Sequence, residues 1–183
     1  MMQMMSRQAA QRGDKGLAVL LKDIEYIRII ALKGGDSGML VRDAEAGVPD
    51  GPVIVPLAYW KQQRDSRAGA DFGVWLAPAD DPAELADAIA DLPVIALDFP
   101  QFADGRSYSN GRLLRERYGF AGELRAVGDV LRDQLYAMEQ VGFDAFSVRE
   151  DRNPAQELAG LQDFSTGYQV TFLREQALFR HAR

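Results

Sequence analysis

Val94-Ile95-Ala96-Leu97 is the stretch that decides the fold, because it is one of five short apolar runs separated by helix-forming sequence. The other four are Val53-Ile54-Val55, Gly73-Val74-Trp75-Leu76, Leu124-Arg125-Ala126-Val127 and Ala145-Phe146-Ser147-Val148. Continuous apolar runs are typical of parallel strands that are covered on both faces. The repeated order of strand, loop and helix predicts βα units. We therefore expect an α/β fold with a mostly parallel sheet, either open or curved like part of a barrel.

The segments between these runs predict helices. A capping box at Asp81-Pro82-Ala83-Glu84 precedes a helical face made of Leu85, Ala88, Ile89 and Leu92. A similar start recurs at Asn153-Pro154. Asp129 is expected to cap a helix that buries Leu131, Leu135 and Met138 and ends at Gly142. Another helix is expected from Ser107 or Ser109 to Tyr118, with Arg115 and Arg117 on its solvated face.

The chain is expected to form one domain. Residues 1–16 are interpreted as a mobile leader and residues 17–183 as a single α/β domain. Within it, residues 17–50 form a β-rich segment and residues 51–183 the βα-repeat core, with the turn cluster at 47–52 as the boundary. Apolar runs near Ile27 and Met39 flank a glycine-rich stretch at 34–38, which predicts an N-terminal β-hairpin-like segment.

Composition excludes several function classes. The 27 acidic and 21 basic residues give a net charge of -6, which argues against nucleic acid or an anionic membrane as a partner. The chain has no cysteine, so it cannot form disulfides or hold an iron–sulfur cluster by thiolates. Its one histidine, His181, leaves no histidine metal cluster or Ser-His-Asp triad. No apolar run is long enough to span a bilayer, and we expect a cytoplasmic protein.

Polar side chains follow three of the predicted strands. Ligands of α/β sheets bind beside the carboxyl ends of the strands, so these residues are the candidate site. Asp98 and Asp129 are the candidate catalytic residues, and the candidate substrate-binding residues are Asp104, Arg106, Ser109, Arg112, Arg125 and Arg149. Two structural alternatives remain open. Asp98 could simply pair with Arg106 or Arg125, and Asp129 could be only a helix cap.

Arginine is the dominant base of this region. All four lysines precede residue 62, whereas every later base except His181 is arginine. The guanidinium fork binds carboxylates and oxyanions bidentately, so a small oxyanion is the expected ligand. The hydroxyl of Ser107 or Ser109 could help to hold it at the start of a helix. A genome that uses arginine in place of lysine would give the same pattern. The spacing of the acids demands no metal, and the sequence identifies no cofactor.

Five segments of this region resemble one uncharacterised bacterial family, a domain of unknown function. They are residues 98–100, 104–109, 113–119, 122–135 and 142–146, and the resemblance extends from about Val53 to Gln169. Genes of that family lie beside those for sulfite reductase and phosphoadenylyl-sulfate reductase, and its members are labelled oxidoreductases of sulfite reduction. The resemblance implies a role in assimilatory sulfur reduction, with sulfite reductase or another enzyme of that pathway as partner. It supplies no catalytic residues.

Three functional hypotheses follow, and the sequence does not decide whether the chain is an enzyme. The first is an accessory protein or oxidoreductase of sulfite assimilation, with an arginine- and aspartate-lined mouth that binds an oxyanion or the reductase. The second is an enzyme that acts on a small phosphorylated or sulfated metabolite, with Asp98 as general base. The third is a structural or assembly subunit. Without cysteine, any redox role needs a bound flavin or nicotinamide, or electrons from a partner.

Overall fold

A computed structural model describes residues 17–19, 27–31, 38–45, 47–66, 72–148, 152–163 and 171–172. Its centre is an 8-stranded sheet with the strand order β1-β2-β8-β7-β6-β5-β4-β3. The strands are β1 (Leu17–Val19), β2 (Ile27–Ala31), β3 (Met39–Leu40), β4 (Val53–Pro56), β5 (Phe72–Leu76), β6 (Val94–Phe99), β7 (Glu123–Gly128) and β8 (Ala145–Val148). The five apolar runs of the sequence therefore coincide with β4 to β8.

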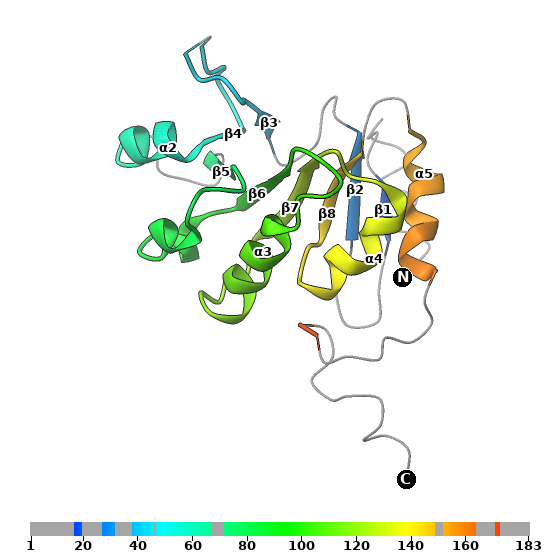
Figure 1. Ribbon diagram of the computed structural model, residues 1–183. Helices are drawn as coiled ribbons and strands as arrows, with labels where there is room; N and C mark the ends of the chain where they lie inside the picture. The colour runs from blue at the N-terminus through cyan, green and yellow to red at the C-terminus, as the bar shows by residue number, and fades with distance from the viewer. Residues whose placement is uncertain are drawn as a thin grey trace, which may run out of the picture.

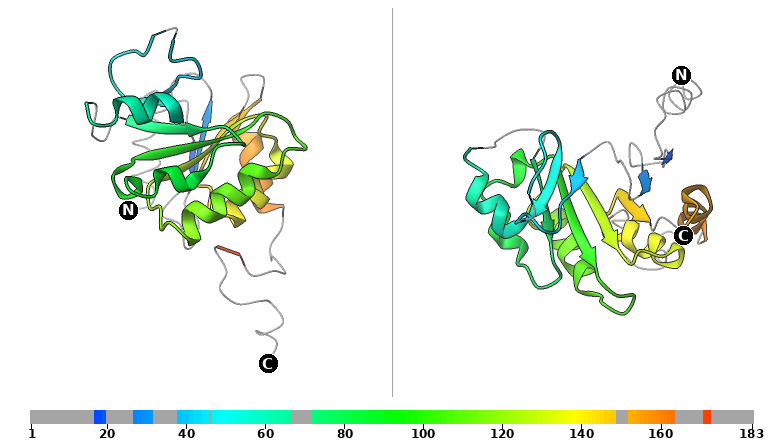
Figure 2. Two further views of the ribbon diagram at one scale, coloured as in Figure 1. Left: turned by 60° about the vertical axis from the view of Figure 1, so that its left-hand side comes forward. Right: turned by 90° about the horizontal axis from the view of Figure 1, so that it is seen from above.

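The sheet is parallel except at one end. Strands β3 to β8 lie in chain order, each parallel to the one before, and β2 then adds to β8 in parallel. This neighbour-to-neighbour order is that of a (β/α) barrel. Seen from above, the strands follow an arc (Figure 2). The α/β fold is confirmed, and of the two expected forms the structure is the partial-barrel one, a curled sheet.

The N-terminal hairpin-like segment is formed by β1 and β2, which pair antiparallel. The second apolar run of that segment does not join it. Strand β3 pairs in parallel with β4, whereas β2 pairs with β8 several strands away. The glycine-rich stretch before Gly38 lies outside the described residues, as do the leader at 1–16 and His181.

The helices lie on one face of the curled sheet, with α3 and α4 in front of it (Figure 1). The α-helices are α2 (Leu57–Gln63), α3 (Arg106–Glu116), α4 (Arg132–Gln140) and α5 (Pro154–Glu157), and the 3-10 helices are η1 (Pro82–Leu85), η2 (Ile89–Asp91) and η3 (Leu158–Gln162). Within the described ranges, no helix is both long and apolar enough to cross a membrane.

Two of the predicted helices differ from the structure. Residues 81–92 form two short 3-10 helices held by hydrogen bonds between residues three apart, although Leu85, Ile89 and Leu92 are buried as expected. Asp129 does not cap α4. Its N-cap is Leu131, whose backbone N–H donates to the Gln134 side chain at 3.0 Å. The start at Asn153-Pro154 is confirmed by α5, and α3 spans most of the predicted helix.

The alternation of side chains along each strand builds two separate cores. Ile95, Leu97 and Phe99 of β6 belong to the large core beneath the helices. Val94 and Ala96 of the same strand belong to a small core on the opposite face, together with Ile54 and Val127. We call this opposite face the inner face. Asp98 and Arg125 alternate with residues of the large core, so their side chains also lie on the inner face.

Candidate functional site

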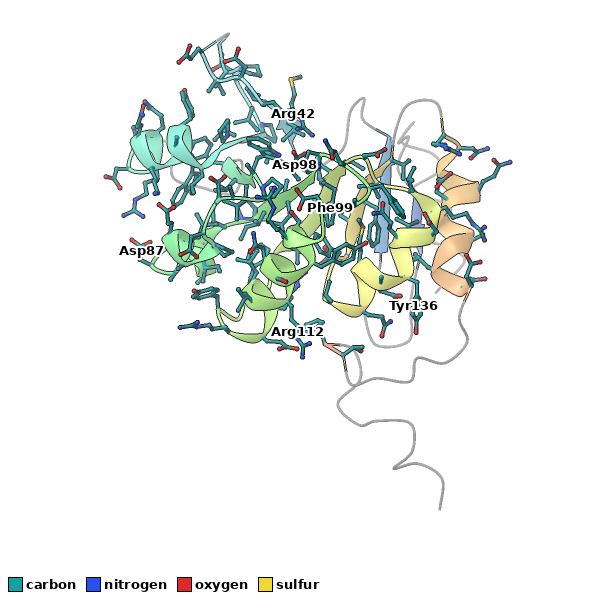
Figure 3. The ribbon with its side chains drawn as sticks, viewed as in Figure 1. Arg42, Asp87, Asp98, Phe99, Arg112 and Tyr136 are labelled. Carbon is teal, nitrogen blue, oxygen red and sulfur yellow. The ribbon has the colours of Figure 1, made fainter. Side chains whose placement is uncertain are left out.

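An ion pair crosses the inner face at the carboxyl ends of the strands. Arg42, two residues after the end of β3, donates from Nη2 to Asp98 Oδ1 over 2.7 Å. Strands β4 and β5 lie between β3 and β6, so the pair spans four strands. Figure 3 shows the two side chains meeting above the strand ends. The Asp98 side chain is only 7% exposed, and a charge so buried requires a partner such as this guanidinium.

Trp75 holds Arg42 at a second point. The guanidinium carbon lies 5.4 Å from the centroid of the Trp75 ring, within the range of a cation–π interaction. Among the described residues, Asp98 accepts the one hydrogen bond that Arg42 donates, and the Arg42 side chain remains 47% exposed. A guanidinium has five N–H donors. Arg42 is therefore fixed in place while part of its fork still faces outward.

Gly128 lets β7 approach this ion pair closely. Its φ of +103° lies in the left-handed region, and a Cβ there would come within 2.5 Å of Phe99 O and 3.0 Å of Asp98 Oδ1. The next residue, Asp129, donates its backbone N–H to Phe99 O at 2.7 Å. The ends of β6 and β7 are thus locked together around Asp98. We call Arg42, Trp75, Asp98 and Gly128 the mouth.

Arg106 does not reach Asp98. It grips Asp104 instead, with Nε donating to Oδ1 at 3.0 Å and Nη2 to Oδ2 at 2.7 Å. This bidentate hydrogen bonding lowers the pKa of Asp104 and raises that of Arg106. The Arg106 side chain is 60% exposed, so the two residues form a surface pair between the loop before α3 and the first turn of α3.

The other candidates on α3 also lie away from the mouth. Arg112 pairs with Glu116 one helical turn on, at 2.9 Å, and Ser109 is exposed. The Ser107 hydroxyl donates to the backbone oxygen of Asp98 at 2.5 Å. The expected role of Ser107 in holding an anion is therefore replaced by a structural one, which ties the start of α3 to the end of β6.

Arg125 is buried in the inner face rather than at the strand end. Its side chain is 4% exposed, and Nε donates to Glu123 Oε1 over 2.6 Å. It lies beside Ala96 in the register of β6 and β7, two residues before the level of Asp98. The expected pairing of Asp98 with Arg106 or Arg125 is therefore wrong, and Arg42 takes that place.

The structure thus brings Asp98 to the mouth, and Asp129 follows Gly128 of the mouth with its backbone N–H bonded to Phe99 O. The predicted arginines do not gather there, because each of the three that are described pairs with an acid two or four residues away: Asp104, Glu123 or Glu116. Arg149 lies outside the described residues. Arg42 was missed because it precedes the arginine-rich half of the chain, where the candidate residues were expected. The rule applied there, that the residues just after a strand form the site, would have found it after Met39-Leu40-Val41.

The chemistry available at the mouth is anion recognition. Arg42 offers charge and directed donors, Asp98 holds it, and Trp75 supplies an aromatic surface. In the described part of the chain, no group of three or more histidine, cysteine, aspartate or glutamate side chains is placed to hold a metal ion.

Comparison with known proteins gives a family and no further function. The model of the family described as "Bacterial protein of unknown function (DUF934)" matches residues 73–179, more than half of the chain. The matched part begins in β5 and includes Trp75, Asp98 and Gly128, whereas Arg42 precedes it. No curated protein matches the chain. The chain belongs to the DUF934 family of bacterial proteins of unknown function.

Proposed function

We propose that the protein is an accessory protein of assimilatory sulfite reduction that binds a small oxyanion at the mouth. The resemblance to proteins encoded beside sulfite reductase supports the pathway. The observation that carries the oxyanion is Arg42, a half-exposed guanidinium held at the carboxyl ends of parallel strands. Ligands of α/β sheets bind at these strand ends, and guanidinium groups suit sulfite and sulfate.

Asp98 acts as a positioning residue in this proposal. Its carboxylate is buried and its Oδ1 accepts from Arg42, so it orients the guanidinium toward an incoming ligand. The same ion pair weighs against the second hypothesis, because a general base must be open to the substrate proton. A bound anion would place a second negative charge beside Asp98. The Arg42 guanidinium has further N–H donors, so it can bind the carboxylate and the anion together.

The proposed role is accessory, because the chain cannot carry out thiol or thiolate-cluster chemistry by itself. It contains no cysteine. Electrons for sulfite reduction would have to come through a bound organic cofactor or from a partner enzyme. Sulfite reductase is the partner that the resemblance implies, and the oxyanion would be its substrate or a close relative of that substrate.

Calorimetric titration with sulfite and with sulfate tests the ligand. The wild type should bind at least one of them, and Arg42→Gln should lose about tenfold or more in affinity, since a hydrogen bond to a charged group is removed. Arg106→Gln is the matched control, because Arg106 is also an exposed arginine paired with an aspartate but lies outside the mouth. It should bind like the wild type.

Two results would contradict the proposal in different ways. If the wild type binds neither anion, or if Arg42→Gln and Arg106→Gln bind equally well, the mouth is not an oxyanion site. Capture of purified sulfite reductase on the immobilised protein tests the partner separately. Absence of capture, with and without sulfite, would remove the reductase as partner and leave anion binding to stand on its own result.

A further inference from the structure

Two buried donors on the inner face form no hydrogen bond within the described residues, although one of them, Arg125 Nη2, is ion-paired with Glu123. Among the described residues, Trp75 Nε1 and Arg125 Nη2 are the buried side-chain nitrogen or oxygen atoms without a hydrogen-bond partner. Buried polar groups are almost always paired, since an unpaired donor loses its water and gains nothing in exchange. Arg125 is almost fully buried, with only 3% of its surface exposed. Such a donor pair indicates that something else supplies the acceptor.

The two donors come from the same row of the sheet. Trp75 of β5 and Arg125 of β7 both lie beside Ala96 of the strand between them. Ala96 and Trp75 belong to the small core of the inner face, and Arg125 lies on that face by the alternation of β7. Neighbouring strands are about 4.8 Å apart, so the two backbones are separated by roughly 10 Å. Only the methyl group of Ala96 projects between the two long side chains.

Glu123 accepts a hydrogen bond from one nitrogen of the Arg125 guanidinium, Nε, and not from Nη2. Its Oε1 accepts from Nε at 2.6 Å, and Nη2 lies 2.6 Å from the same oxygen without forming a hydrogen bond to it. The charge of the guanidinium is therefore balanced by Glu123, which lies two residues earlier on the same strand, whereas Nη2 forms no hydrogen bond. Carboxylates and tetrahedral oxyanions carry two or more acceptor oxygens, so one such group could accept from both the guanidinium and the indole N–H.

We infer that Trp75 and Arg125 form a deeper acceptor subsite on the inner face, which takes an oxygen of a bound oxyanion or carboxylate. It deepens the proposed function and rests on it in one respect, that the same ligand is bound by the mouth. Trp75 belongs to both the mouth and the subsite, because Arg42 stacks on its ring while its Nε1 would donate to a ligand in the subsite. The ligand is thus held by Arg42 from outside and by two buried donors from within.

Trp75→Phe tests the subsite, because it removes Nε1–H and keeps an aromatic ring beneath Arg42. In calorimetry with sulfite, sulfate and acetate, this variant should bind the preferred anion about tenfold more weakly than the wild type. Acetate separates a carboxylate ligand from a tetrahedral oxyanion, and sodium chloride at the same ionic strength is the salt control. Trp60→Phe is the matched control, because Trp60 is buried in the large core and should leave affinity unchanged.

Fluorescence gives a second readout that does not depend on Trp75→Phe. The chain has 2 tryptophans, so Trp60→Phe leaves Trp75 as the one source of indole emission. The preferred anion should change the intensity or wavelength of that emission with the same midpoint as calorimetry, and Arg125→Lys should weaken the response. Circular dichroism of each variant checks that it is folded.

The outcomes separate this inference from the proposed function. If Arg42→Gln abolishes binding while Trp75→Phe stays within twofold of the wild type and Trp75 emission does not respond, the deeper subsite is wrong and the mouth stands. If Trp75→Phe weakens binding while Arg42→Gln does not, the subsite stands and the mouth is wrong. If no anion binds to the wild type, both are overturned.

Discussion

The two ends of the sheet each contain an arginine–aspartate pair, and the pairs differ in how completely the arginine is used. At the amino-terminal end, Arg115 donates from Nε to Gly142 O, from Nη1 to Phe120 O and Gly122 O, and from Nη2 to Asp144. Its side chain is 7% exposed. At the carboxyl end, Arg42 is 47% exposed and donates to Asp98.

This difference separates a structural arginine, Arg115, from Arg42, the arginine that we propose binds an anion. The Arg115 cluster joins the end of α3 to the starts of β7 and β8, and Asp144 also accepts from Leu124 N. Burial raises the pKa of Asp144 to about 6, although the charge of Arg115 opposes this shift. In (β/α) barrels the amino-terminal end serves stability and the carboxyl end serves chemistry. The proposed function gives the curled sheet the same division.

Arg115→Ala should give the largest effect and is the strongest test of this division. It removes four hydrogen-bond contacts, so Asp144 Oδ2 and three carbonyls lose the donor that Arg115 supplies, and the free energy of unfolding should fall by about 3 to 5 kcal/mol. Urea denaturation followed by circular dichroism measures the change. Arg112→Ala on the exposed face of the same helix should cost less than about 0.5 kcal/mol. Equal costs for the two variants would contradict the structural role.

The raised pKa of Glu139 predicts that the amino-terminal end of the sheet also contributes to the pH dependence of stability. This residue near the end of α4 is buried, and burial raises its pKa to about 7 although Gln140 opposes the shift. A raised native-state pKa means that the folded chain holds the proton more tightly than the unfolded chain. Stability should therefore fall as pH rises from about 4.5 to about 7 and level off above that.

Glu139→Gln should reduce this slope to the part that Asp144, with its pKa of about 6, contributes, and it should raise stability at pH 8 relative to the wild type. The gain should be roughly 2 kcal/mol, because one pKa unit corresponds to about 1.4 kcal/mol and solvent near the helix end screens part of the shift. Urea denaturation at several pH values measures it. Glu116→Gln on the exposed face of α3 is the control and should keep the wild-type slope. An unchanged slope in Glu139→Gln would show that another group titrates.

Gly128→Ala tests the close packing of β7 against β6 at the carboxyl end of the sheet. The new Cβ would lie 2.5 Å from Phe99 O at a φ of +103°, so the variant should lose about 2 kcal/mol of stability. It should also bind the anion more weakly, since Asp98 must move. Gly119→Ala is the matched control, because Gly119 has a φ of +66° and no atom within 4 Å of the added Cβ. If both variants lose the same stability, the close approach to Phe99 is not what constrains Gly128.

Arg42→Gln should give the smallest effect on stability. The glutamine amide can still donate to Asp98, but this buried carboxylate loses its counter-charge, so the cost should be about 1 kcal/mol, well below that of Arg115→Ala. Anion affinity should nevertheless fall, as described above. This pattern, binding lost and stability kept, is the reverse of that expected for Arg115→Ala. A stability loss as large as that of Arg115→Ala would show that both ends of the sheet are structural.

Local spacing accounts for several ion pairs that were not among the expectations drawn from the sequence. The pairs Asp104–Arg106, Glu123–Arg125 and Arg112–Glu116 join residues two or four positions apart, so they are readable from strand and helix periods. They explain why the predicted arginines do not converge. Arg115 was expected on a solvated face and is buried, because the carbonyls that it satisfies come from turns 5 to 27 residues away.

The sequence by itself determined the elements and their class. Continuous apolar runs placed β4 to β8, because strands covered on both faces have such runs. The helix-forming segments between the runs indicated crossover connections, which join parallel strands. It also determined that Asp98 stands close to a strand end, since the apolar run from Val94 to Leu97 leads directly into it.

Only the tertiary structure decided what Asp98 meets. Arg42 lies 56 residues earlier, and the two are brought together because β3 adds to β4 at one edge of a sheet that curls. The same curl turns Trp75 and Arg125 toward a shared inner face from strands that are not neighbours. Contacts of this kind depend on strand order and curvature, and neither leaves a periodic signal in the chain.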